Sequence, residues 1–414
     1  MLFSVQPAHS STTSRIDEYY SALTKMEQFS GKVLYYKSGK KEFAKTFGEA
    51  FQNKTSFSFR VGSLSKPITA TAVLSLVEKK KLDLDARVNT VITNLNIPNS
   101  VTTRNLLNQT SGAVYEFSRD VKTEDEFRAA LKEMSWNEPG KWVYSNIGYQ
   151  ILGLVVKEIS KQSLYSYLEK DVFPKLTLNS VQNLVQGTSI DCGKVSTIDH
   201  NPFYDVGSGG VMASPEVIAD FFIALNEDKI ISLPSKENML KDPDQNGYGF
   251  GMNIKNINGK MIYGHNGSVP GFKSFVMFNE KKDFLLVFNN LEQFPLIQAQ
   301  KDATLLLTGK SFSIPIPVHR KESRQDSKAL MDFVGRYVLD FDANQKLEIS
   351  YNSVNGHFYM LDEGKKKKLI PDSKNSFFIC PTSEDTVYFK RKSKKVFLEL
   401  TALGGAKFTA SRIE

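Results

Sequence analysis

Hairpin signals occur early and late in this chain, and mostly helical sequence separates them. One hairpin is predicted over residues 31–47 and two more over residues 252–263 and 272–288, because β-forming residues flank short turns there. We predict that these early and late strands join in one antiparallel sheet. Residues 82–235 then form an inserted helical subdomain, with a cleft between it and the sheet. The predicted fold class is α+β, an α/β sandwich whose antiparallel sheet is flanked by helices.

The last part of the chain has a different pattern. Residues 313–329 contain prolines and charges without periodicity, which predicts a linker. Over residues 330–414 short strand-like runs recur about every ten residues, which indicates a small antiparallel β-barrel. We therefore predict an N-terminal tail over 1–13, a main domain over 14–312, the linker, and the C-terminal barrel.

Residues 59–70 place a hydroxyl and an amine where they can act together, because Ser63 precedes Lys66 by three positions. Apolar residues follow at helical spacing from Ile68, and Pro67 suits only the first turn, so we predict that a helix begins close to Ser63. Both side chains then lie on one face, about one turn apart. A serine becomes a nucleophile when an adjacent base takes its proton, and Lys66 is the candidate base. For an isolated S-x-x-K, the alternative is a capping serine followed by a solvated lysine.

Two further segments carry polar residues at turns. Residues 139–146 precede a second predicted helix, with Asn146 placed to cap it and Tyr144 on a turn that can face the cleft. On their own, a helix cap and a half-buried aromatic residue are the more common interpretations. His265 stands among glycines between two late strands, where Gly267 lets a substrate approach the backbone closely. A lone histidine there is often only a turn residue.

The formal net charge of +8 raises the question of an anionic partner. Much of the basic excess lies in three short runs, at residues 79–81, 365–368 and 390–395. Lysines at a helix C-terminus complement the dipole, and runs at strand ends are typical of solvated turns. No zinc-finger, basic-zipper or aromatic RNA-binding signature accompanies the charge, so we do not expect a nucleic-acid partner.

The cysteines, the histidines and the hydropathy of the chain exclude several classes of protein. Cys192 and Cys380 are far apart, in different predicted domains, so we do not expect a disulfide framework. The five histidines form no metal-binding spacing, and we expect neither a metal nor a cofactor. No stretch approaches the ~20 apolar residues of a membrane-spanning helix. Residues 1–10 resemble the end of a truncated secretory signal, which favours a periplasmic or secreted protein, with the cytoplasm as the alternative.

Taken together, the three polar segments resemble the motifs of the serine β-lactamase and penicillin-binding-protein superfamily, and most closely its class C β-lactamase-like esterases and D-amino-acid peptidases. The S-x-x-K motif of that superfamily is matched by Ser63 to Lys66. Its Y-x-N element is matched by residues 144–146 and its H-x-G element by residues 265–267. The resemblance covers about residues 15–300, and the tail resembles the small barrel appended to many such proteins. Supporting segments are also similar to the family: 31–34, 106–112, 209–214 and 264–272.

The resemblance implies three catalytic roles. Ser63 would be the acylated nucleophile, Lys66 its hydrogen-bonded activator, and Tyr144 the acid/base that moves protons to and from the leaving group. Burial would lower the pKa of Lys66, and a cationic Lys66 would lower the pKa of Tyr144. Both effects cannot operate fully at once, so the sequence leaves open which of the two is the base.

The resemblance also implies four binding roles. Asn146 would hold Lys66 and the substrate amide, and His265 would line the strand edge beside the acyl group. The backbone N–H groups of Ser63 and Ser268 would form the oxyanion hole. Gly267 would matter for that hole without carrying chemistry itself.

The third motif departs from the K-T-G of many relatives, because a histidine replaces the lysine. A neutral histidine offers a donor without the fixed charge that binds carboxylates. We therefore expect hydrolysis of a small ester, or of a D-amino-acid amide or peptide, with weaker turnover of β-lactams. The alternative is a non-catalytic or weakly acylated penicillin-binding-like protein that binds peptides or ligands. The sequence does not predict an oligomeric state.

Overall fold

The computed structural model describes residues 11–413, except 52–55, 179–182, 200–203, 244, 317, 319, 324–329, 341, 363, 382–384, 393–394 and 403–405. The protein divides into two compact units. One contains Met1–Asp17, Phe29–Ser189 and Thr197–Ser313, and the other Glu18–Gln28, Ile190–Ser196 and Ile314–Glu414. Most of the predicted tail, residues 1–13, lies outside the described residues.

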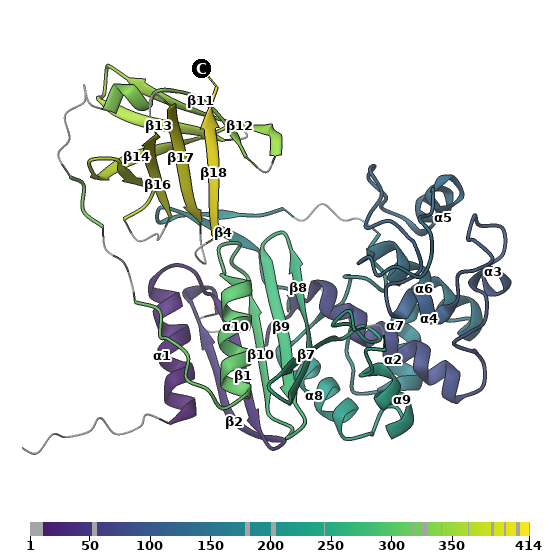
Figure 1. The fold of residues 1–414 in the computed structure, drawn as a ribbon. Coiled ribbons are helices and arrows are strands. Elements are labelled where there is room, and N and C mark those ends of the chain that lie inside the picture. The colour runs from purple at the N-terminus through teal and green to yellow at the C-terminus, as the bar shows by residue number, and fades with distance from the viewer. Residues whose placement is uncertain are drawn as a thin grey trace, which may run out of the picture. The chain divides into compact units, whose positions relative to one another are not determined.

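A six-stranded antiparallel sheet forms the centre of the first unit (Figure 1). Its order is β2-β1-β10-β9-β8-β7, so early and late strands meet, as predicted. The junction is the β1–β10 pair, which runs in register from Gly31 opposite Asn289 to Tyr36 opposite Phe284. The strands are β1 (Gly31–Lys37), β2 (Lys40–Phe47), β7 (Asn253–Ile257), β8 (Lys260–Val269), β9 (Phe272–Asn279) and β10 (Phe284–Asn289).

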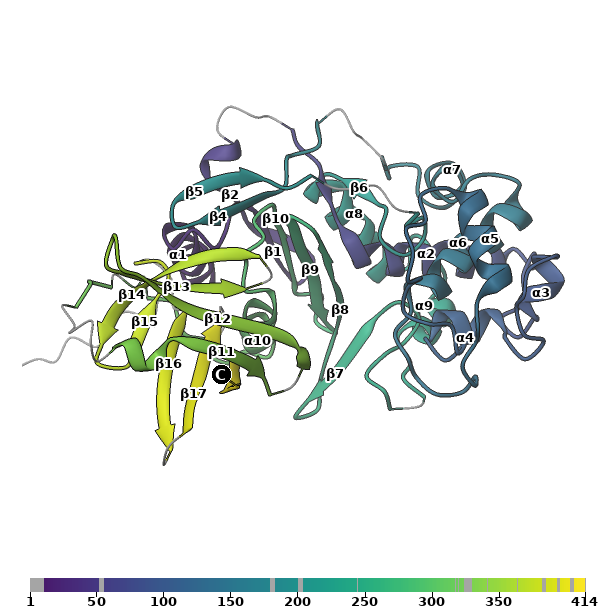
Figure 2. The same ribbon diagram turned by 90° about the horizontal axis from the view of Figure 1, so that it is seen from above.

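Helices supply the rest of the first unit, apart from short strands. Figure 2 shows α3 to α7 gathered on the far side of α2 from the sheet. Helix α10 packs on β9 and β10, and α8 packs on β1 and β10. The helices of the chain are α1 (Thr12–Lys25), α2 (Ser65–Glu78), α3 (Val88–Val91), α4 (Thr103–Leu107), α5 (Glu124–Glu133), α6 (Asn146–Ser160), α7 (Leu164–Tyr167), α8 (Pro215–Asn226), α9 (Leu233–Met239) and α10 (Leu296–Leu307).

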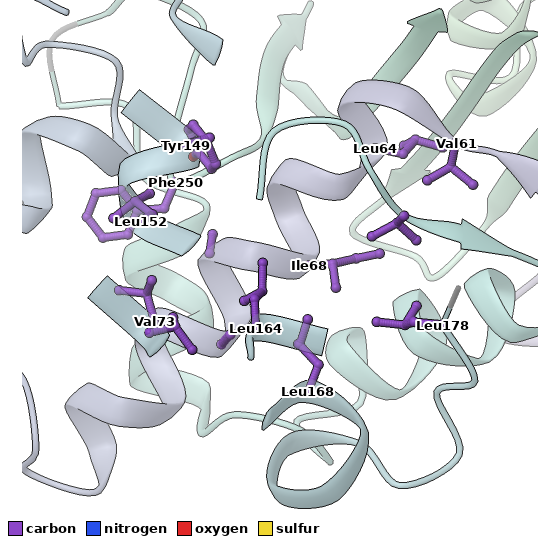
Figure 3. Packing of buried hydrophobic residues seen from close by; sticks show 14 of the residues in the cluster. Val61, Leu64, Ile68, Val73, Tyr149, Leu152, Leu164, Leu168, Leu178 and Phe250 are labelled. Atoms are coloured by element: carbon purple, nitrogen blue, oxygen red, sulfur yellow. The ribbon is translucent and has the colours of Figure 1, made fainter. Parts of the chain in front are cut away.

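Helix α2 is buried on nearly every side, because its sequence is apolar or small almost throughout. Figure 3 shows Ile68 and Val73 of α2 among residues of α6 and α7, including Leu152 and Leu164. A helix held this way cannot shift without opening the core, and cores of this density resist small displacements. The first turn of α2 is therefore a rigid base for the side chains it carries.

The second unit contains a closed barrel of eight antiparallel strands, which confirms the prediction of a C-terminal barrel. Strand β11 pairs with both β12 and β18, which closes it. Aromatic rings fill the interior, where Phe333 stacks on Phe389 with centroids 4.4 Å apart. The strands are β11 (Gly335–Leu339), β12 (Asp342–Asn352), β13 (His357–Asp362), β14 (Lys365–Ser373), β15 (Ser376–Phe378), β16 (Thr386–Lys392), β17 (Lys395–Ala402) and β18 (Ala406–Arg412).

The lysine run at 365–368 does not form the solvated turn that its composition suggested, because it begins β14. Lys366 stands opposite exposed Leu361, and such outward-facing positions accept charged residues, whose stems and heads find partners on the neighbouring strand. Lys366 Nζ lies 4.3 Å from the centroid of the Tyr359 ring, and Lys367 Nζ lies 3.9 Å from Asp362 Oδ2. Strand β14 was not predicted, because strands were identified from runs of apolar residues.

The expectation of no disulfide framework, based on placing the two cysteines in different domains, is wrong, because Cys192 and Cys380 form a disulfide within the second unit. Cys192 lies in the turn between β4 (Thr188–Asp191) and β5 (Lys194–Thr197), a hairpin in the region predicted to be helical. Cys380 follows β15. Two cysteines separated by 188 positions leave no local signal of pairing. In the described part of the chain, no helix combines the length and apolar character that crossing a bilayer requires.

Candidate active site

Ser63 lies in a 3-10 turn, Gly62–Leu64, directly before α2 begins at Ser65. The helix therefore begins close to Ser63, as the sequence predicted. Ser65 ties the turn in place, since its Oγ donates to Gly62 O at 2.8 Å and accepts from Val211 N at 3.1 Å. The spacing still brings the pair together, with Lys66 Nζ 3.0 Å from Ser63 Oγ.

Lys66 is fully buried, and its ammonium position is surrounded by acceptors. Besides Ser63, Nζ contacts Asn146 Oδ1 at 2.6 Å and the carbonyl oxygen of Ser208 at 2.9 Å. Burial lowers the pKa of Lys66 from 10.5 to about 7, while the negative charges of Glu116 and Asp205 oppose the shift. Desolvation penalises the charged form, so a neutral amine is accessible at physiological pH.

Tyr144 contacts the same serine. Its hydroxyl donates to Ser63 Oγ at 2.9 Å, and Lys66 Nζ lies 4.7 Å from its ring centroid. Burial raises the pKa of Tyr144 well above 10, with Tyr248 adding to the rise. The expected lowering by a cationic Lys66 does not dominate here, because removing a phenolate from water costs more. Tyr144 is therefore a protonated donor.

Asn146 is not the helix cap that its position suggested. Ser145 is the N-cap of α6, and its Oγ accepts from Gly148 N at 3.0 Å. The Asn146 side chain is thereby free to act elsewhere. Its Oδ1 accepts from Lys66, and its Nδ2 donates to Glu116 Oε1 at 2.5 Å. The Asn146 amide also hydrogen-bonds the Tyr115 side chain, so it has several partners within the protein.

Strand β8 passes the serine turn at backbone contact distance. A Cβ on Gly267 would lie 1.8 Å from Val61 O, so no other residue fits there. A Cβ on Gly62 would lie 2.9 Å from the backbone nitrogen of Ser268, which places that amide against the turn that carries Ser63. Ser274 on β9 fixes the contact, because its Oγ donates to Val61 O at 3.0 Å.

His265 is buried beside these groups, with its ring centroid 6.2 Å from that of Tyr144. Its Nδ1 lies 2.6 Å from Asn266 O and its Nε2 lies 3.3 Å from the hydroxyl of Tyr248. Burial lowers the pKa of His265 to about 3, and the positive charge of Lys66 adds to this effect. Unlike the donor expected from the sequence, its two ring nitrogens both have partners within the protein.

The structure thus brings together all the residues that the resemblance singled out: Ser63, Lys66, Tyr144, Asn146, His265, Gly267 and Ser268. Sequence reasoning missed four neighbours. Ser208 acts through its backbone carbonyl, which its side chain does not reveal. Glu116 belongs to no recognisable motif. Ser274 and Tyr248 have the residue types of ordinary strand and core positions. Only the Gly209–Gly210 pair next to Ser208 gave a sequence signal there. Among the described residues, no group of three metal-ligating side chains could hold an ion.

Comparisons with known proteins identify the family and the fold. The sequence model of the family described as Beta-lactamase matches residues 22–289. Penicillin-binding protein 4* of Bacillus subtilis (strain 168) is 25% identical over 421 residues, which covers 89% of this chain and 92% of that protein. The octameric penicillin-binding protein homologue from Pyrococcus abyssi has a similar fold, with a TM-score of 0.64, 21% identity and coverage of 97% of this chain and 100% of that chain. The D-amino acid amidase from Ochrobactrum anthropi SV3 aligns with a TM-score of 0.59 and 19% identity, covering 71% and 97% of the two chains.

Proposed function

This chain belongs to the β-lactamase family, and we propose that it is a serine hydrolase that forms an acyl-enzyme on Ser63 and cleaves esters or D-amino-acid amides and peptides. The observation that carries the proposal is the contact of Ser63 Oγ with both Lys66 Nζ, at 3.0 Å, and the Tyr144 hydroxyl, at 2.9 Å. A hydroxyl placed between a base and a proton donor is the arrangement that covalent catalysis requires.

Acylation begins with the neutral form of Lys66, which the lowered pKa makes available. Its amine takes the proton from Ser63, and Oγ attacks the substrate carbonyl carbon. The oxyanion that forms accepts hydrogen bonds from the backbone N–H groups of Ser63 and Ser268. Support for this pair comes from the close approach of Ser268 N to Gly62. One such donor is typically worth about 3 kcal/mol of transition-state stabilisation.

Collapse of the tetrahedral intermediate expels the alcohol or amine, which needs a proton. Tyr144 supplies it, because its phenol is protonated and already touches Ser63 Oγ. Lys66 then returns its proton to Tyr144, which restores both groups. Water enters after the leaving group departs, gives a proton to the neutral Lys66 amine and attacks the acyl carbon. The second tetrahedral intermediate then breaks its bond to Ser63 Oγ, which takes that proton back from Lys66, and the acid leaves. The Asn146 amide keeps Lys66 in position throughout and also contacts the substrate amide.

The substrate class follows from the charge of the site and from the relatives. The wall of β8 carries a neutral histidine where a carboxylate-binding lysine would favour penicillins and free C-termini. The Ochrobactrum neighbour is an amidase of D-amino acids. Esters and D-amino-acid amides therefore rank above β-lactams, which should turn over more slowly.

Intact-mass spectrometry across a panel of p-nitrophenyl esters, D-alanine amides and β-lactams tests the proposal. We expect an acyl adduct of the substrate's acyl mass on the wild-type protein, together with release of the leaving group. The Ser63→Ala variant, folded to the same melting temperature, should show neither. Adduct formation without release of product would indicate a binding protein that has lost turnover, and no adduct with any compound would contradict the proposal.

We also propose that the protein works outside the cytoplasm. The Cys192–Cys380 disulfide supports this, because such bonds form and persist in oxidising compartments. Fractionation of the native host's cells, with thiol labelling of the intact protein, tests it. Recovery of a reduced protein from the cytoplasmic fraction alone would contradict this proposal.

A further inference from the structure

Tyr248 and His265 form a buried pair beside the nucleophile. Tyr248 precedes β7 and is 2% exposed, while His265 on β8 is 3% exposed. Both rings neighbour the proton donor, since the Tyr144 centroid lies 6.4 Å from that of Tyr248 and 6.2 Å from that of His265. No step of the proposed mechanism uses Tyr248.

The contacts of His265 determine where its proton resides. A carbonyl oxygen only accepts hydrogen bonds, so the 2.6 Å contact with Asn266 O requires a proton on Nδ1. A neutral imidazole then has a bare Nε2, which accepts from the Tyr248 hydroxyl at 3.3 Å. With this tautomer, the ring has no N–H left to offer a substrate.

The surroundings also keep the ring uncharged. Protonation would place a buried second cation near Lys66, and the pKa of His265 is lowered to about 3 by burial first and by Lys66 second. Lys255 and His265 line the same cavity of about 210 Å³. The titratable groups that face His265 from the elements around it are Lys66 of α2, Tyr144 ahead of α6, Tyr248 ahead of β7, Lys255 of β7 and Tyr263 of β8.

The surface beside the serine is accordingly aromatic. Trp142 packs edge-on against Tyr248, with centroids 6.0 Å apart, and is 37% exposed at the rim. The Asn146 amide there contacts two titratable groups, Glu116 Oε1 at 2.5 Å and Lys66 Nζ at 2.6 Å. A substrate carboxylate against this wall would lose water and gain no donor from His265, which is unfavourable.

We propose that Tyr248 is a positioning residue that locks His265 in its neutral Nδ1–H form, so that this wall selects substrates without a carboxylate beside the scissile bond. The proposal rests on the proposed hydrolase function for its kinetic consequence, but the locked tautomer does not depend on turnover. A histidine in this state excludes a carboxylate because the ring offers no donor to replace the water that the carboxylate loses.

The first arm of the test is nuclear magnetic resonance of the full chain labelled with nitrogen-15 histidine. We expect one histidine to keep a protonated Nδ1 and a bare Nε2 from pH 5 to pH 9, and His265→Gln identifies its signal by loss. In Tyr248→Phe the same ring should exchange its proton between the two nitrogens or titrate closer to the ordinary value of about 6.5. Titration of wild-type His265 near 6.5, or a proton on Nε2, would overturn the proposal.

The second arm compares two aryl esters with the same acyl group, 3-carbamoylphenyl phenylacetate and 3-carboxyphenyl phenylacetate. The wild type should favour the carbamoyl ester in kcat/KM by at least about tenfold, since a charged hydrogen bond is worth that much or more. The preference should stay flat with pH in the wild type, shrink toward low pH in Tyr248→Phe, and vanish or reverse in His265→Lys. Equal cleavage of both esters by the wild type would overturn the selection. Cleavage of neither, with the tautomer intact, would instead contradict the hydrolase function.

Discussion

The first turn of α2 and the interior of the barrel are both densely packed, but polar groups fill the first and apolar side chains fill the second. Around α2, buried polar groups pair with one another: Lys66 with Asn146, and Ser65 with Gly62 and Val211. In the barrel the described core is formed by apolar residues, and rings such as Phe333 and Phe389 stack on each other. The polar region around α2 holds reactive groups in place at a cost in stability, because a buried polar group without a partner is destabilising. The apolar core of the barrel stabilises the folded barrel.

The largest difference between the regions should appear when the nucleophile is removed. Ser63→Ala should reduce ester hydrolysis by at least about 10⁴-fold, because the covalent step is lost. The melting temperature should change little, because the variant removes one hydroxyl and leaves the core intact. Initial rates and a thermal melt on the same preparation measure both. Residual activity within tenfold of the wild type would place the chemistry elsewhere.

The converse change is in the barrel. Phe389→Ala should destabilise the second unit by about 3–5 kcal/mol, because a fully buried ring leaves a cavity. Tyr388→Ala, the exposed neighbour, is the matched control and should have a much smaller effect. Denaturant unfolding monitored by circular dichroism measures the change. The acylation rate per folded molecule should stay within a factor of about two, and a large loss there would show that the two regions are not separable.

Gly267→Ala tests whether the oxyanion hole depends on the close backbone contact between β8 and the serine turn. The new Cβ would meet Val61 O at 1.8 Å, so β8 must move away from the serine turn. We expect a loss of about 10²–10³-fold in kcat, the size of one oxyanion-hole donor. Gly148→Ala in α6 is the control, because its Cβ would have no neighbour closer than 3.7 Å. Equal activity of the two variants would contradict the assigned position of the Ser268 amide.

The smallest effect should come from the rim of the polar region. The charge of Glu116 raises the pKa of Lys66, so Glu116→Gln should lower that pKa further. Hydrolysis then persists to lower pH, and the acid limb moves by less than about one pH unit because Glu116 is exposed. Glu237→Gln on α9, exposed and distant in sequence, should leave the limb in place. A shift toward higher pH would contradict the charge coupling.

The comparison also explains what the sequence revealed. Ser63 and Lys66 were found because chemistry requires their spacing, and the sheet was found because turns mark its hairpins. Strand β14 was missed because outward positions of a barrel accept lysines. Tyr248 and the cysteine pair were missed because their meaning depends on partners that are distant in the chain. Sequence patterns predict features that depend on neighbouring residues. Contacts between residues distant in the chain produce no periodic pattern in the sequence.

The account depends most on a neutral lysine that activates a serine. The most direct measurement is the pre-steady-state acylation rate of the wild-type protein as a function of pH, with a p-nitrophenyl ester. Because the neutral amine is the active form and its pKa is about 7, the rate should rise about tenfold per pH unit below pH 7 and level off above it. A rate that is flat through pH 7 and rises only near pH 10 would contradict the central claim.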